Sequence, residues 1–180
     1  MKNLALNSLT YTGIVTLSQY IGTKKVKIAQ FHNTGGDALF NFFIDCLVEE
    51  NLDTIKARRP KKVMLVQRYL VGETVTDGYY RYTPASGFIY MQTNGERVEN
   101  EIGRVRYKFV ISRDQLDAVS DYNNLGLGLY SQNATDVDAN NGNHLAFCML
   151  NFSRNALANS SLVVDWELSI SNGGANAANL

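Results

Sequence analysis

The chain has 180 residues, 17 basic and 17 acidic side chains and a formal net charge of zero. Its length predicts a single domain with a buried core, and its charge balance excludes a globally basic nucleic-acid-binding protein. Only 19% of the residues are charged and Asn makes up roughly a tenth of the chain, which predicts a neutral surface suited to packing against other subunits.

The first predicted element is a β-hairpin over residues 9–32. Leu9–Gln19 is rich in Thr, Val, Ile and Tyr, which favour strands. In Lys24–His32 apolar side chains alternate with lysines, which is typical of a second strand. Gly22-Thr23 supplies the turn between the two strands.

A helix is predicted over residues 37–49, with Asp37 as its N-cap. Apolar side chains recur there at helical spacing. They are Leu39, Phe42, Phe43, Cys46 and Leu47, and Phe40 and Ile44 widen the stripe. Because this helix is apolar on most sides, we expect it to be buried, either in the core of its own fold or against a partner.

Short strands are expected in the rest of the chain, at Val63–Val66, Phe88–Gln92, Arg97–Ile102, Arg104–Ile111, Leu125–Tyr130, Leu145–Phe152 and Leu162–Ile170. The Asn94-Gly95 pair predicts a tight hairpin between the second and third of these strands. Residues 72–86 are expected to be rich in turns. Strict alternation in the last strand predicts that Trp166 faces the core.

These elements predict a mainly β fold, an antiparallel β-sandwich or barrel-like domain with one early α-helix. The single domain is expected to cover residues 1–171, with the sandwich strands over 61–171, and residues 172–180 are expected to form a flexible tail. No apolar run is long enough for a membrane helix. Neither a secretory signal nor a disulfide framework is visible, so we expect a protein made in the cytoplasm that needs no membrane.

The sequence offers little for catalysis. Its only imidazole bases are His32 and His144, and we interpret both as strand-end or interface residues. A zinc site that combined them with Cys46 and Cys148 lacks paired ligand spacing. Gly126-Leu127-Gly128 lacks the third glycine of a dinucleotide fingerprint, which favours a packing role. We therefore predict no catalytic residue, no cofactor and no enzymatic activity.

Oxygen-bearing side chains alternate in one loop, at Asp136, Asp138 and Asn140. Such spacing suits a hard cation such as calcium. The loop departs from an EF-hand, because its glycine comes one residue late and no glutamate stands at the twelfth position. A solvated polar turn is the favoured interpretation, so we predict no metal site and keep these three residues as the remaining ligand candidates.

Residues 56–62 form a basic run ahead of a strand. Such runs usually lie on a solvated surface, but this one is also a candidate contact to an acidic partner subunit or to packaged nucleic acid. The neutral chain and the lack of interleaved aromatic residues favour a protein partner over sequence-specific nucleic-acid binding. The predicted interface residues are Lys56, Arg58, Arg59, Lys61 and Lys62.

Four stretches carry a resemblance to a known group of proteins. They run from Leu9-Thr10-Tyr11-Thr12-Gly13 to His32-Asn33-Thr34-Gly35-Gly36, then through Leu39-Phe40-Asn41-Phe42, Arg59-Pro60-Lys61-Lys62-Val63-Met64-Leu65 and Val164-Asp165-Trp166-Glu167-Leu168-Ser169-Ile170. Together they resemble small virion structural proteins of tailed bacteriophages, most nearly those of the crAss-like phages of gut bacteria. The resemblance implies a subunit of a ring, collar, tail or capsid-decorating layer, and it transfers no catalytic residue.

We therefore expect a non-enzymatic virion subunit that assembles in many copies, in a neck or tail ring or on the capsid. Its expected partners are further copies of itself and the portal, tail or capsid subunits of the virion. The alternative is a carbohydrate- or receptor-binding β-sandwich, in which Tyr79, Tyr80 and Tyr82 form a stacking platform beside the Asp136–Gly142 loop.

Overall fold

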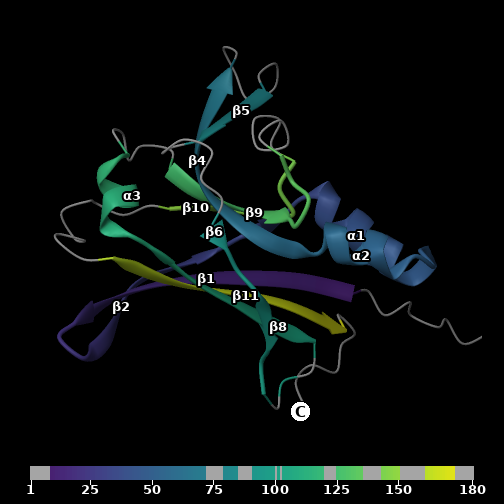
Figure 1. Ribbon diagram of the computed structural model, residues 1–180, viewed down its shortest axis with the longest axis horizontal. Helices are drawn as coiled ribbons and strands as arrows, with labels where there is room; N and C mark the ends of the chain where they lie inside the picture. The colour runs from purple at the N-terminus through teal and green to yellow at the C-terminus, as the bar shows by residue number, and fades with distance from the viewer. Residues whose placement is uncertain are drawn as a thin grey trace, which may run out of the picture.

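The computed structural model describes residues 9–71, 79–84, 91–99, 101, 103–119, 125–135, 143–150 and 161–172. The fold is mainly β, with two antiparallel sheets that share one core (Figure 1). This confirms the predicted fold class. In chain order the elements are β1 (Leu9–Ile21), β2 (Lys24–His32), β3 (Thr34–Gly35), α1 (Asp37–Val48), α2 (Leu52–Arg58), β4 (Pro60–Val71), β5 (Tyr79–Pro84), β6 (Met91–Gln92), β7 (Gly95–Arg97), β8 (Arg104–Ile111), α3 (Arg113–Asp117), β9 (Leu125–Ser131), β10 (Ala146–Met149) and β11 (Leu162–Asn172).

The first sheet has the strand order β2-β1-β11-β8-β7 in the described part of the chain. Strands β1 and β2 form the predicted hairpin, with its turn at Gly22-Thr23. Strand β1 also pairs with β11, from Leu9 opposite Asn172 to Ser18 opposite Val163. The first and last described strands are therefore neighbours inside this sheet, and they lie side by side over most of their length (Figure 1).

The second sheet has the order β3-β10-β9-β4-β5, and β6 pairs with β4. The strand expected at Val63–Val66 is longer and covers Pro60–Val71. The prediction that residues 72–86 are rich in turns was wrong for Tyr79–Pro84, which form β5 against the end of β4. Three tyrosines favour a strand there, but that strand becomes visible only once its partner is known.

Close packing explains the two glycines of β9. A Cβ atom on Gly126 would lie 2.4 Å from Cζ of Phe147, and one on Gly128 would lie 2.5 Å from Cε2 of Tyr130. Both distances are far below van der Waals contact, so only glycine lets these aromatic rings lie against the strand. The predicted packing role of Gly126-Leu127-Gly128 therefore agrees with the structure.

The main core lies between the two sheets. Trp166 is fully buried there, and the inward side chains of β8 and β11 alternate as expected. A smaller buried cluster contains Met64, Val66, Tyr130, Ala134 and Phe147. The large, fully buried side chains of the main core are Trp166, Leu17, Ile111, Leu116, Leu125, Leu127, Leu129 and Leu162.

The hairpin predicted at Asn94-Gly95 was wrong. Strand β6 pairs with β4 in the second sheet, whereas β7 pairs with β8 in the first. The chain crosses between the sheets at Thr93, which is 3% exposed. Its backbone N–H donates to Lys61 O at 2.8 Å and its hydroxyl donates to Lys108 O at 3.1 Å. Thr93 thus connects the two sheets. Its hydrogen bonds to distant strands outweigh the preference of Asn94-Gly95 for a tight hairpin turn.

The prediction of a single helix was also wrong. Helix α2 is capped by Asn51, whose Oδ1 accepts from the backbone N–H of Asp53 at 2.9 Å. Helix α3 has a full capping box, in which Ser112 and Gln115 bond each other's backbone. The Ser-x-x-Gln spacing was a readable signal for that helix. Helix α1 is confirmed, but its N-cap is Gly36, without a side-chain bond, and Asp37 is its first residue.

Candidate functional site

Helices α1 and α2 form a hairpin at one end of the molecule, which we call the arm (Figure 1). Residues 49–51 join the two helices, and Glu49 Oε1 accepts from the backbone N–H of Asn51 at 2.9 Å. An ion pair between Arg58 of α2 and Asp45 of α1 connects them side by side. The backbone N–H groups of Gln132 and Asn133 also donate to Arg59 O at 2.9 Å and to Ala57 O at 3.0 Å, so caps, this ion pair and backbone hydrogen bonds to the body position the arm.

Helix α1 carries an inner apolar stripe that packs against the protein and an outer apolar stripe that is largely exposed, although the ring of its first residue, Phe40, contacts the ring of Tyr11 at 6.4 Å between centroids. On the inner stripe Leu39 is fully buried and Phe42 and Phe43 are partly buried. The outer stripe has the spacing i, i+4, i+7 and i+8. Its residues and their exposed fractions are Phe40 50%, Ile44 57%, Leu47 82% and Val48 69%.

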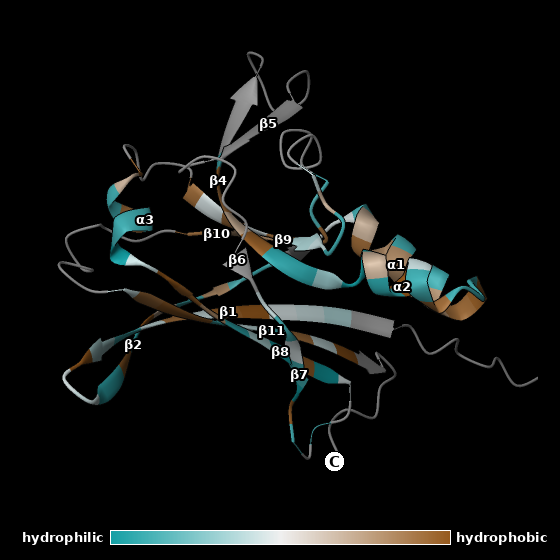
Figure 2. Ribbon diagram, in the orientation of Figure 1, coloured by the Kyte–Doolittle hydropathy of each residue, from teal (hydrophilic) through white to brown (hydrophobic). Residues whose placement is uncertain are grey.

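Because Leu39 is the only buried residue of α1, the expectation of a helix buried in its own fold was wrong. The alternative, burial against a partner, remains a prediction. Figure 2 shows that hydrophobic and hydrophilic segments alternate along the arm, which extends beyond the two sheets. Leu52, at the start of α2, adds a further side chain that is 67% exposed. Sequence periodicity identified the apolar residues but could not say which stripe would be covered.

The basic run lies at the base of the arm and is divided between α2 and β4, with Arg59 between them. Lys56 and Arg58 belong to α2, where they pair with Asp53 and Asp45. Arg59 precedes β4, and its Nε donates to Gln132 Oε1. Lys61 and Lys62 lie in β4, where Lys61 is partly buried and the Nζ of Lys62 donates to Ala134 O. Part of the run is therefore neutralised within the chain, and its role as an interface stays a prediction.

A depression of about 280 Å³ lies where the arm joins the second sheet. It is lined by the ion pair of Asp45 and Arg58 together with the polar side chains of Asn41, Ser131 and Asn143. The carboxylate and the guanidinium are already paired with each other. The depression therefore lies between the arm and the sheet, and neither of these two charged groups is left unpaired to act on a substrate.

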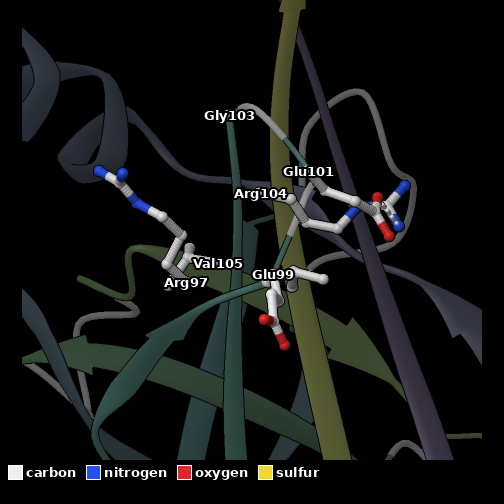
Figure 3. A pocket seen from close by; sticks show the side chains of 7 residues that line it. Arg97, Glu99, Glu101, Gly103, Arg104 and Val105 are labelled. Carbon is white, nitrogen blue, oxygen red and sulfur yellow. Dashed lines mark ion pairs between the residues drawn. The ribbon is translucent and has the colours of Figure 1, made fainter.

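A larger depression of about 920 Å³ lies beside β7 and the start of β8. Figure 3 shows that Arg97 lies on one side and that the ion pair of Glu101 with Arg104 lies on the other. Arg104 also approaches Glu167 at 3.8 Å. The charged groups do not point toward a common centre, so the geometry lacks the converging groups that a catalytic site requires.

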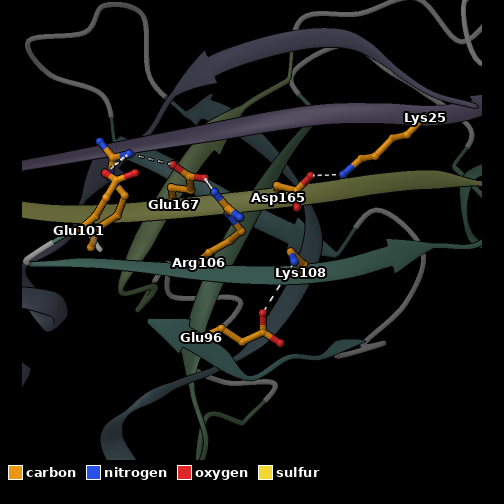
Figure 4. A network of polar contacts seen from close by, with 8 residues as sticks. Lys25, Glu96, Glu101, Arg106, Lys108, Asp165 and Glu167 are labelled. Carbon is orange, nitrogen blue, oxygen red and sulfur yellow. Dashed lines mark hydrogen bonds and ion pairs between the residues drawn. The ribbon is translucent and has the colours of Figure 1, made fainter. Parts of the chain in front are cut away.

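The outer face of the first sheet carries a ladder of opposite charges (Figure 4). Arg106 pairs with Glu167 at 2.5 Å, and Lys25 of β2 pairs with Asp165. Glu167 stands directly opposite Arg106 in the register of β11 and β8. Opposite charges at facing positions stabilise a sheet. The charges of these two pairs are therefore neutralised within the chain, and this face suits contact with water.

The chemistry-bearing residues are dispersed. His32 is exposed at the end of β2, and the ring of His144 contacts Phe147 at 5.2 Å between centroids. Cys46 is exposed on α1, whereas Cys148 is buried in the core. Across the part of the chain that the structure describes, no three His, Cys, Asp or Glu residues gather as metal ligands.

Two further predictions fall outside what the structure describes. Asp136, Asp138 and Asn140 lie outside the described residues, as do residues 173–180 of the predicted tail. Ser171 and Asn172 belong to β11. Tyr79, Tyr80 and Tyr82 lie on β5, and the directions of their side chains are not described.

Comparison with protein families, with characterised proteins and with solved structures gives no match to this chain. None of the described helices has the length and apolar character needed to cross a membrane. The exposed apolar side chains of the arm make it the main functional candidate among the described residues.

Burial also gives Cys148 a measurable property. Desolvation raises the pKa of its thiol from 9.0 to about 12. The unfolded thiol loses its proton near pH 9 while the folded thiol keeps it. The contribution of the buried, protonated Cys148 thiol to the free energy of unfolding is therefore complete below pH 9 and is lost as the pH rises toward 12.

We expect the free energy of unfolding to fall by about 1.4 kcal/mol per pH unit above pH 9, as measured by urea unfolding between pH 8 and pH 10. The Cys148→Ala variant should lack this fall, and Cys46→Ala should retain it. Tyr11 and Tyr107, whose pKa values burial raises to about 12, ionise in the unfolded chain only near pH 10. Equal slopes in the two cysteine variants would contradict the assignment.

Proposed function

We propose that this protein is a non-enzymatic structural subunit of a tailed-phage virion and assembles in many copies. The proposed location is a neck or tail ring, with capsid decoration as the other possibility. The protein would be made in the host cytoplasm and incorporated into the particle. Its partners would be further copies of itself and portal, tail or capsid subunits.

The observation that carries the proposal is the outer stripe of α1. Its four apolar side chains and Leu52 are each at least half exposed and lie together on the arm. Burying one large apolar side chain contributes about 1.5–3 kcal/mol, so covering this stripe would stabilise a complex substantially. Large exposed apolar patches mark interaction sites, and the four side chains of this stripe recur on one face of α1.

The charged face of the first sheet does not need a partner, which limits the proposed contacts to other parts of the surface. The charge ladder of the first sheet is neutralised within the chain, so that face gains little from a partner. The neutral composition also limits repulsion between copies packed closely together. The resemblance to small virion proteins of tailed phages is the reason for proposing a virion as the assembly to which the protein belongs.

The proposal is tested by measuring the mass of the purified protein over a range of concentrations, alone and together with the products of the neighbouring genes. We expect closed homo-oligomers, or a stable complex with a virion ring protein. A strictly monomeric protein under all of these conditions would contradict the proposal. Glycan binding by that monomer would support the carbohydrate-binding alternative instead.

A further inference from the structure

Exposed apolar side chains gather at two ends of the molecule. Of the eight large apolar side chains that are exposed among the described residues, five lie on the arm and two lie at the end of the β1–β2 hairpin. These two are Tyr20, 56% exposed, and Ile21, 60% exposed. The eighth, Val110, lies on β8, which β11 separates from the hairpin. Figure 1 shows the hairpin turn and the arm at opposite ends of the long axis.

The two ends carry opposite charges. The tip of the arm is acidic, with Glu49, Glu50 and Asp53 around the turn between its helices. Among the described residues Glu50 has no ion pair or hydrogen bond. Asp53 shares its charge with Lys56, a pair whose side chains are 89% and 60% exposed.

The end of the hairpin is basic and carries Lys24, Lys25 and Lys27. Lys25 is paired with Asp165, and Lys27 donates to the neutral side chain of Gln30. Within the described part of the chain Lys24 has no acidic partner. Apolar and basic groups are thus adjacent here, as apolar and acidic groups are on the arm.

The two ends cannot neutralise each other within one molecule. Strand β1 has 13 residues and is about 43 Å long at the usual rise per residue. The screening length is about 8 Å at physiological ionic strength. The charges at the two ends therefore act independently unless a second molecule brings them together.

We propose that the arm of one copy docks on the β1–β2 hairpin end of the next copy, in a head-to-tail contact. The outer apolar stripe of the arm would cover Tyr20 and Ile21, and the acidic tip would approach Lys24 and Lys27. A contact between two different surfaces of the same chain is heterologous, so it repeats and closes into a ring when the rotation per copy allows. This inference rests on the proposed function and specifies the contact on which assembly would depend.

The test uses full-length protein with one charged residue placed in either surface. Leu47→Asp disables the arm and Ile21→Asp disables the hairpin end; Val110→Asp is the matched control, because Val110 is similarly exposed but lies on β8, which β11 separates from the hairpin. We expect each of the first two variants to lower the association constant by about tenfold or more. The control should assemble like the unaltered protein, and all three should keep its melting temperature to within a few degrees.

Mixing the two disabled variants distinguishes head-to-tail contact from symmetric pairing. A head-to-tail contact leaves one intact arm and one intact hairpin end in the mixture, so a one-to-one heterodimer should form and grow no further. Symmetric pairing of arms would instead leave the Ile21→Asp variant dimeric on its own. That result would overturn the proposal.

A charge exchange tests the electrostatic part. Lys24→Glu and Glu50→Lys should each weaken assembly, and combining both in one chain should restore it. If oligomers form and none of these variants alters them, the head-to-tail contact is wrong while the proposed assembly stands. If the unaltered protein is monomeric with every candidate partner, the proposed function itself fails.

Discussion

Replacing Trp166 by Ala is expected to lower the free energy of unfolding by about 3–5 kcal/mol, the cost typical of deleting a large buried aromatic side chain. The indole is fully buried in the main core. It lies on β11, between Val15 of β1 and Tyr107 of β8. Its loss would leave a cavity where three central strands meet. A loss of this size is a large part of the stability of an ordinary domain.

Urea unfolding measures this loss, and two further variants make it interpretable. Trp166→Phe should cost less, because the indole Nε1 has no hydrogen-bond partner among the described residues and Phe removes that unsatisfied group. Val110→Ala, on the exposed side of β8, should change stability by about 0.5 kcal/mol or less. Should Trp166→Ala fail to fold, the Trp166→Phe variant still gives a value. Unaltered stability in both Trp166 variants would place the indole outside the core.

The second large effect is expected at Gly103, where Ala should cost about 2–4 kcal/mol. Gly103 has φ +75°, a conformation that residues with a Cβ atom adopt at a cost. A Cβ atom there would also lie 2.3 Å from the backbone O of Ile170. Because that oxygen belongs to β11, whose Ile170 N–H also donates to Gly103 O at 2.9 Å, the chain cannot relax without disturbing the first sheet.

Gly22 provides a matched control for this prediction. It has φ +61° in the hairpin turn, and no heavy atom lies within 4 Å of the position of its Cβ. Gly22→Ala therefore carries only the conformational cost, about 1 kcal/mol. The difference between the two variants in thermal or urea unfolding isolates the steric collision. Equal losses would mean that the backbone near Gly103 moves freely away from Ile170.

Local sequence patterns were sufficient for several elements. The β1–β2 hairpin and its turn follow from two strand-forming segments around Gly22-Thr23, and β8 was predicted with its observed bounds. Strict alternation placed Trp166 in the core. These features depend on the period of two residues in a strand and on turn chemistry, both of which act over a few neighbouring residues.

Other local signals were present but were outweighed or overlooked. Asn94-Gly95 predicts a tight turn, yet Thr93 is held by Lys61 and Lys108 from different sheets. Ser112-x-x-Gln115 has the spacing of a capping box and begins helix α3, which the prediction of a single helix missed. The short helix α2 depends on its Asn51 cap and on its ion pair with α1, and a helix of seven residues has little stability alone.

The candidate interaction surfaces were decided by tertiary structure. Periodicity alone made α1 apolar on most sides, but the packing of Leu39 on the body fixes which stripe faces inward and leaves Leu47 outward. Likewise, the sequence contains Tyr20 and Lys24 near a turn, but only the pairing of the long strands β1 and β2 places that turn at the end opposite the arm. Composition and periodicity determine which apolar side chains recur on one face of a helix or strand, because these are properties of neighbouring residues. Which of those side chains stay exposed depends on contacts between distant strands, such as the pairing of β1 with β11, and that pairing leaves no local signature in the sequence.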